Sequence, residues 1–171
     1  MAAIVLMAGH ENSVNQIGNT ILALVNHPAQ LQKVRSGPRL IPAAVEEALR
    51  FDTPTPYGLR SALEDVEIGE VYVARGDLLL TGLGSANRDP DLLDRPDAFD
   101  VTRRQGGRHL SFGQGIHFCS GASLARAETR AVLDALLRTT NGIQLSVPSA
   151  DLRHRPTPFF RGLESLPLSL W

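Results

Sequence analysis

Residues Phe112–Gly121, FGQGIHFCSG, hold the only cysteine of the chain, Cys119. Three glycines lie within nine positions of this stretch, and glycine allows a backbone to turn tightly and to approach a flat ligand closely. Apolar residues at helical spacing follow directly, so the cysteine stands at the start of a predicted helix. The amide groups and the dipole of a helix N-terminus favour a thiolate over a neutral thiol. We therefore expect an anionic sulfur held against a flat ligand.

A thiolate placed in this way is suited to be the axial ligand of a haem iron. His117 lies two residues before Cys119 and is placed to meet an anionic group of the same ligand. The alternative is a buried structural cysteine, which is the commoner state of a lone cysteine considered without its neighbours. The glycines around the sulfur favour the ligand hypothesis.

The composition excludes several other classes of protein. The 171 residues are 43% hydrophobic and 20% charged, which predicts a globular chain with a core. A net charge of -1 provides no electropositive surface for nucleic acid and no attraction to an anionic membrane. A single cysteine excludes an internal disulfide and fits a reducing compartment, and the apolar run Ile4–Ala8 is too short to span a bilayer. We expect a cytoplasmic protein without nucleic-acid or membrane partners.

Helical and strand-like patterns surround the cysteine loop. Near the start, one face of a predicted helix carries Val14, Ile17, Ile21 and Leu24. In the middle of the chain, Val66–Ile68 and Val71–Val73 flank a turn and predict a β-hairpin. A helix is predicted after Cys119, and Ile143–Val147 alternates as a strand. The fold class predicted is therefore mainly α with small antiparallel β elements (α+β).

The loop also carries a family resemblance. Phe112–Gly121 closely resembles the cysteine loop of the cytochrome P-450 family of haem-thiolate monooxygenases, and Ala122–Arg126 resembles the start of the family's proximal helix. The resemblance implies haem b (iron protoporphyrin IX) as cofactor, with Cys119 as the axial ligand of its iron. Ser120 departs from the pattern, because the family usually has an apolar residue beside the sulfur.

The same resemblance implies further contacts to the haem. Phe112 and Gly113, at the start of the loop, belong to the implied cofactor site. In the family, an arginine at the position of Arg60 and the residue matching His117 each reach a haem propionate. Two basic side chains suit two carboxylates, while the alternative for Arg60 is an ordinary surface arginine.

A structural triad is implied outside the loop. Glu47 and Arg50 are three residues apart on a predicted helix, a spacing that by itself is common on protein surfaces. The pair resembles the family's Glu-x-x-Arg motif, and Arg103 matches the arginine of the later meander that completes a buried triad behind the cysteine loop. Arginine suits this role because its planar fork pairs with a carboxylate and keeps its charge.

The first helix resembles the family's central distal helix, with one departure. Ala8 and Gly9 are small, as required where dioxygen must fit over the iron, and Glu11 matches the acid of the proton-delivery pair. Asn12 stands where a threonine is usual, with Ser13 next to it. The resemblance implies Glu11 and Asn12 as catalytic residues. An amide orients water or a substrate hydroxyl but relays protons poorly, so the role of Asn12 differs from that of the family's threonine. The alternative is a core helix with a glycine kink.

The resemblance covers the whole chain, yet family members are well over twice as long and this sequence begins inside the distal helix. It implies a C-terminal portion that lacks the N-terminal helices, with a missing N-terminal polypeptide as partner. We expect the isolated 171 residues to bind haem poorly and to turn over slowly or not at all. The implied segments are the distal helix (1–27), Glu-x-x-Arg helix (39–52), β region (57–81), meander (82–110), cysteine loop (111–121), proximal helix (122–140) and C-terminal β region (143–171).

Three functional interpretations remain open on the sequence alone. The first is a monooxygenase that inserts one atom of dioxygen into a small organic substrate, using electrons from a ferredoxin-type donor. The second is a non-catalytic helper protein derived from the family, although such helpers commonly lack the haem cysteine that is present here as Cys119. The third is a thiol enzyme built on His117 and Cys119, which would need a base-orienting acid that the sequence does not place.

Overall fold

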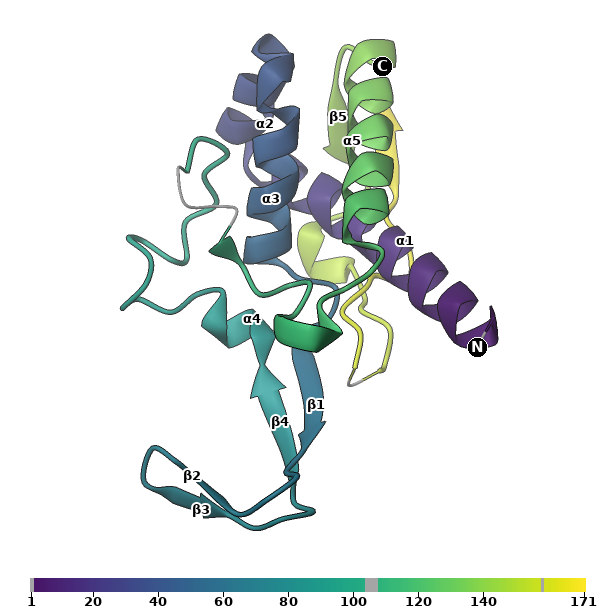
Figure 1. Ribbon diagram of the computed structural model, residues 1–171. Coiled ribbons are helices and arrows are strands. Elements are labelled where there is room, and N and C mark those ends of the chain that lie inside the picture. The colour runs from purple at the N-terminus through teal and green to yellow at the C-terminus, as the bar shows by residue number, and fades with distance from the viewer. Residues whose placement is uncertain (1, 104–107, 158) are drawn as a thin grey trace.

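The computed structural model describes residues 2–103, 108–157 and 159–171, with the side chains described from residue 8 onward. Residues 104–107 of the predicted meander lie outside the described part. Four helices form a body, and β-strands extend from it as an arm (Figure 1). The predicted class, mainly α with small antiparallel β elements, is confirmed.

The helical body is built around α3. Its helices are α1 (Ala2–Asn26), α2 (Pro28–Ser36), α3 (Ile41–Phe51) and α5 (Ala122–Thr139), with a 3₁₀ turn η1 (Pro38–Leu40) between α2 and α3. α1 contacts both α3 and α5, and it crosses α5 obliquely in Figure 1. No helix in the described ranges is long and apolar enough to cross a membrane.

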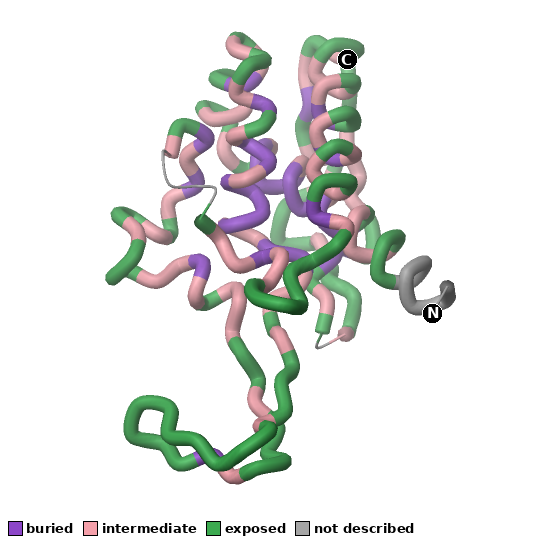
Figure 2. Tube along the Cα trace, in the orientation of Figure 1, coloured by how far each residue is buried: buried purple, intermediate pink, exposed green. Residues whose placement is uncertain are grey.

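The core follows from the apolar face of α3. Val45 and Leu49, one turn apart, are fully buried against side chains of the other helices. Leu24 of α1, Val34 of α2 and Leu133 of α5 meet them there. Each such side chain contributes about 1.5–3 kcal/mol through burial. The stable part of the molecule is therefore the α3-centred cluster, which Figure 2 shows as the main concentration of buried residues.

α1 buries a polar face in addition to part of its apolar one. Of the predicted apolar face, Leu24 is buried, whereas Val14 is 45% exposed. Asn19 is buried because its Nδ2 donates to the carbonyl oxygens of Asp52 (3.1 Å) and Arg161 (3.0 Å). The expectation of a single apolar packing face is thus only partly right, since the orientation of α1 is also set by hydrogen bonds to loops after α3 and near the C-terminus.

In the described part of the chain, six strands form three separate two-stranded antiparallel sheets. β1 (Tyr57–Ser61) pairs with β4 (Leu78–Gly82), and the hairpin of β2 (Val66–Ile68) and β3 (Val71–Val73) lies at the end of this arm, which is almost entirely exposed (Figure 2). The third sheet joins β5 (Ile143–Leu145) to β6 (Leu168–Leu170). The strand that begins at Ile143 is therefore two residues shorter than the predicted strand Ile143–Val147.

The long turn-rich segment after β4 contains one short helix, α4 (Leu83–Ala86). Asn87 follows it and is buried, because its Oδ1 accepts the backbone N–H of Leu110 at 2.6 Å and its Nδ2 donates to Ser111 Oγ at 2.9 Å. Ser111 Oγ in turn donates to the carbonyl oxygen of Leu49 at 2.7 Å. These bonds fix the segment that leads into Phe112 against the end of α3.

Candidate functional site

The cysteine loop is held by its own backbone. The N–H of Cys119 donates to the carbonyl oxygen of Phe112 at 2.9 Å, and Gly113 N–H donates to Leu110 at 2.8 Å. Gly113 and Gly115 have φ angles of 69° and 78°, in the left-handed region that side chains disfavour. The glycines are therefore required by the turn, and Cys119 is left exposed one turn before the start of α5.

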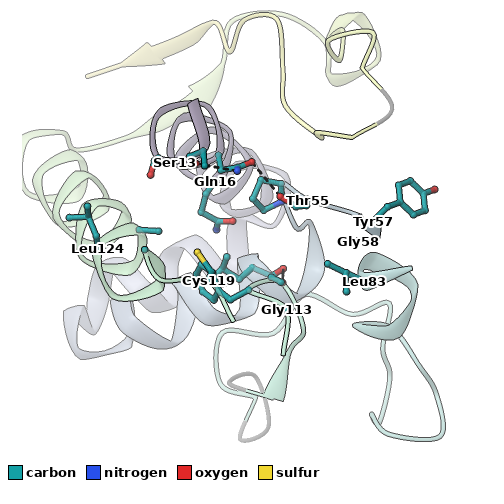
Figure 3. Close-up of a pocket in the computed structure, with 18 of the residues that line it drawn as sticks. Ser13, Gln16, Thr55, Tyr57, Gly58, Leu83, Gly113, Cys119 and Leu124 are labelled. Atoms are coloured by element: carbon teal, nitrogen blue, oxygen red, sulfur yellow. Dashed lines mark hydrogen bonds between the residues drawn. The ribbon is translucent and has the colours of Figure 1, made fainter. Parts of the chain in front are cut away.

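A cavity of about 310 Å³ lies between this loop and α1 (Figure 3). Cys119 forms part of its wall, and Ser13 and Gln16 face it from α1. Five of the residues implicated from the sequence line the cavity together: Asn12, Arg60, Phe112, Gly113 and Cys119. Segments more than 100 residues apart in the sequence thus converge on one space.

Of the catalytic and cofactor-binding residues implicated from the sequence, two are not part of the cavity lining. His117 ends a short 3₁₀ helix, η3 (Gly115–His117), and is exposed. Glu11 is half-buried, and its Oε1 lies 3.7 Å from Nη1 of Arg155 near the C-terminal segment. The structure therefore does not bring these two side chains together with Cys119.

Asn12 is held by two hydrogen bonds. Its Nδ2 donates to the carbonyl oxygen of Ala8 at 3.2 Å, one turn earlier in α1. Its Oδ1 accepts the hydroxyl of Thr55 at 3.3 Å, from the loop after α3. Arg60 is less constrained, because its one hydrogen bond to a described residue runs from Nη1 to the carbonyl oxygen of the preceding Leu59, at 2.8 Å, and the residue is exposed at the cavity rim.

Gln16 adds a polar group that sequence reasoning missed. It is 2% exposed, its side chain extends from α1 toward the cavity (Figure 3), and its Nε2 donates to Thr20 Oγ1 at 2.9 Å. Its Oε1 has no hydrogen-bond partner among the described residues. A buried acceptor without a partner costs free energy unless something in the cavity donates to it.

Glu47, Arg50 and Arg103 form a buried cluster between α3 and the loop that follows α4. Arg50 donates from Nε and Nη2 to the two carboxylate oxygens of Glu47, both at 2.8 Å, and Arg103 Nε approaches Oε1 at 3.2 Å. The exposed fraction of the Glu47 and Arg50 side chains is 1% each. Both arginines also donate to the carbonyl oxygen of Ala98, at 3.0 Å in each case. The cluster ties α3 to the loop that follows α4.

The neighbouring carboxylate, Glu46, forms a second cluster that no local sequence pattern indicates. It accepts hydrogen bonds from His109 at 3.2 Å and from Arg126 at 2.7 and 2.9 Å, and Arg130 lies at 3.4 Å. Burial alone would raise the pKa of Glu46, but the hydrogen bonds from His109 and Arg126 and the charge of Arg126 outweigh it and lower the pKa to about 2. Glu46 is therefore a carboxylate at any ordinary pH.

Known proteins resemble this chain in sequence and in fold. The sequence model of the family described as Cytochrome P450 matches residues 39–141. Cytochrome P450 107B1 of Saccharopolyspora erythraea is 43% identical over 98% of this chain and 42% of its own length. The biotin biosynthesis cytochrome P450 of Bacillus subtilis is 45% identical over 95% of this chain and 40% of its own. The tirandamycin C-bound P450 monooxygenase TamI matches with a TM-score of 0.96 at 42% identity, over all of this chain and 43% of that structure.

The chain therefore spans less than half the length of the relatives that it matches. The match of the family's sequence model begins just before α3 and ends just after α5, so it contains the two carboxylate clusters and the cysteine loop. Family members bind haem b, which agrees with the cofactor implied by the loop. The structural likeness extends over the rest of the described elements at more than 40% identity. The chain belongs to the cytochrome P450 family.

Proposed function

We propose that this chain provides the thiolate half of a haem-b monooxygenase site, with Cys119 as the axial ligand. The observation that carries the proposal is the exposed thiol of Cys119 at the cavity wall, facing α1 across a space bounded by the small residues Ala8 and Gly9. A largely apolar macrocycle with two carboxylates fits such a cavity, in which the glycine turn lets the backbone come close. Arg60 at the rim supplies a cation for one carboxylate.

The proposed reaction inserts one oxygen atom into a C–H bond of a small organic substrate. The other oxygen atom leaves as water, so each turnover consumes one dioxygen, two electrons and two protons. Haem, when bound, supplies the iron at which dioxygen is activated. The chain contributes the sulfur ligand, the walls that exclude bulk water, and side chains that hold protons near the cavity.

Asn12 and Glu11 are the proposed catalytic residues. The amide of Asn12 is fixed by Ala8 and Thr55, so it holds a water or a substrate hydroxyl in a defined place without itself releasing a proton. The side chain of Glu11 extends from α1 toward Arg155. A carboxylate in that position exchanges protons between solvent and the water held at Asn12. His117 is proposed as the second contact to a haem carboxylate.

The proposed reaction requires an electron donor and an organic substrate. A ferredoxin-type protein is the proposed electron donor. The relatives' names include a vitamin D(3) 25-hydroxylase and a 6-deoxyerythronolide B hydroxylase, and one solved structure shows P450BioI with an acyl carrier protein. These names support an organic substrate that is hydroxylated, free or carrier-bound, for the site in this chain.

Haem reconstitution of the 171-residue chain tests the proposal. The reduced protein is exposed to carbon monoxide, and the difference spectrum is compared between the wild type and the Cys119→Ala variant. We expect weak haem uptake, because Ile116, Phe118 and Leu124 near the thiol remain exposed, with a strongly red-shifted Soret band in the bound fraction. The variant should lose that band.

Three results would overturn the proposal. Haem that binds without the red shift, or a shift that survives Cys119→Ala, shows that the thiolate is not the ligand. A chain that takes up no haem favours the helper-protein interpretation instead. Ser146→Ala, which alters an exposed hydroxyl beside β5 and β6, is the matched control and should leave the spectrum unchanged.

A further inference from the structure

Glu46 joins three segments that meet at the cysteine loop. Its carboxylate extends from α3, and its partners are His109 just before the loop and Arg126 and Arg130 in the first half of α5 just after it. The side chain of His109 is 1% exposed and that of Glu46 is 17% exposed, so water screens the cluster little. Cys119 lies between the two segments that Glu46 holds.

The hydrogen bonds of His109 fix its tautomer. The backbone N–H of Ser111 donates to Nδ1 at 3.2 Å, so that nitrogen carries the lone pair. The proton is then on Nε2, which lies 3.2 Å from Oε2 of Glu46 and donates to it. His109 therefore links Glu46 to the backbone of the residue immediately before Phe112.

Arg126 makes the second link. Its Nε and Nη2 donate to the two oxygens of Glu46, in the planar two-point geometry that fixes a guanidinium most firmly. The same guanidinium lies over the ring of Phe112, with its carbon 4.4 Å from the ring centre. The carbonyl oxygen of Phe112 accepts the N–H of Cys119, so the position of this ring bears directly on the backbone that carries the sulfur.

We propose that Glu46 is a positioning residue for the Cys119 thiolate, acting through His109 and Arg126 on Phe112. The inference rests on the proposed function, because it concerns where the sulfur stands toward the cofactor. Glu47, next to it, acts on a different segment, since its partners Arg50 and Arg103 hold the loop after α4. The two adjacent carboxylates thus have separate tasks, and only Glu46 contacts both sides of the cysteine loop.

Glu46→Gln is the test variant, because it keeps the shape of the side chain and removes its charge. Val34→Ala is the control for general loss of stability, since Val34 of α2 is fully buried in the hydrophobic core and has no part in the Glu46 cluster. In the haem-reconstituted chain, the ratio of the red-shifted to the unshifted carbon monoxide band is measured for both. We expect the ratio to fall at least about threefold in Glu46→Gln and to stay unchanged in Val34→Ala.

A measurement without haem separates this inference from the proposed function. In the free chain, hydrogen exchange of the Cys119 N–H reports on its bond to Phe112. The two variants are compared at denaturant concentrations at which their overall stabilities are equal. We expect the Cys119 N–H to exchange about tenfold faster in Glu46→Gln and to show no local change in Val34→Ala. An unchanged exchange rate and band ratio would overturn the positioning role. Absence of the red-shifted band in the wild type would overturn the proposed function. The exchange measurement, which needs no haem, would still decide the role of Glu46.

Discussion

Arg103 donates from Nε to Oε1 of Glu47 over 3.2 Å, joining two positions that are 56 residues apart in the sequence. Its side chain is only 9% exposed, and it also donates to the carbonyl oxygens of Asp94, Arg95 and Ala98. Arg103 is thus both a charge partner of a buried carboxylate and a clamp on a loop that has little regular structure. Loss of the side chain removes the donor to the carbonyl oxygens of Asp94 and Arg95, while Arg50 still donates to Glu47 and to Ala98.

Arg103→Ala should lower the free energy of unfolding by about 3 kcal/mol, because it leaves the buried Glu47 with only one cationic partner. Arg103→Lys should recover part of that loss, since it keeps the charge but not the planar fork. Urea unfolding measures both values. Arg138→Ala removes an exposed pair with Asp134 and should change stability by less than about 0.5 kcal/mol, so a loss as large as that of Arg103→Ala would contradict the argument.

Much of the site could be predicted because its signals are local. Glu47 and Arg50 are three residues apart, and the helix alone places them side by side. The glycines before Cys119 are needed by the backbone of the loop itself, as the positive φ angles of Gly113 and Gly115 show. Such features are encoded within one turn or one loop and require no knowledge of the rest of the fold.

The rest depends on contacts that no local pattern encodes. Glu46 is 63 residues from His109 and 80 from Arg126, and nothing near any of the three indicates the other two. The burial of Asn19 in α1 likewise depends on carbonyl groups of distant loops. Helical spacing shows which residues share a face, but the neighbours decide which face is covered, and Val14 is exposed for that reason.

Gln16→Leu should raise the free energy of unfolding by about 1 kcal/mol in the free chain. The substitution removes the buried Oε1 that has no partner among the described residues, and Thr20 keeps its bond to the backbone carbonyl of residue 16 at 2.7 Å. Thermal unfolding measures the change. Gln32→Leu, on the exposed face of α2, is the control and should change little. A destabilised Gln16→Leu would show that a donor in the cavity satisfies this oxygen.

Gly9→Ala and Gly18→Ala should both stabilise α1 by up to about 1 kcal/mol, because alanine has a higher helix propensity than glycine. An added Cβ at either position meets no described atom within 4 Å. The two variants differ in their place, because Gly9 lines the cavity and Gly18 does not. We therefore expect Gly9→Ala alone to reduce haem uptake, measured by absorbance at equal chain concentration. Equal uptake by both variants would contradict the idea that small residues of α1 make room for the cofactor.

The pH dependence of stability should reveal the Glu46 cluster. The pKa of Glu46 is lowered from 4.5 to about 2 in the folded chain, so the unfolded chain binds the proton more readily. The stabilisation is therefore complete above about pH 5 and is lost as the pH falls toward 2. Because solvent reaches part of this cluster, a shift of this size corresponds to less than about 3 kcal/mol. Urea unfolding of the wild type and of Glu46→Gln between pH 2 and 7 measures it.

The quantity to compare is the difference in free energy of unfolding between the wild type and Glu46→Gln, because the other carboxylates titrate in both proteins. We expect the stability advantage of the wild type to be constant from pH 7 to about 5 and to shrink steadily below that. Arg126→Gln should reduce the same pH dependence, since Arg126 donates two hydrogen bonds to the carboxylate and brings a positive charge beside it. A wild-type advantage that stays constant down to pH 2 would show that His109, Arg126 and Arg130 do not hold Glu46 in its charged form in solution.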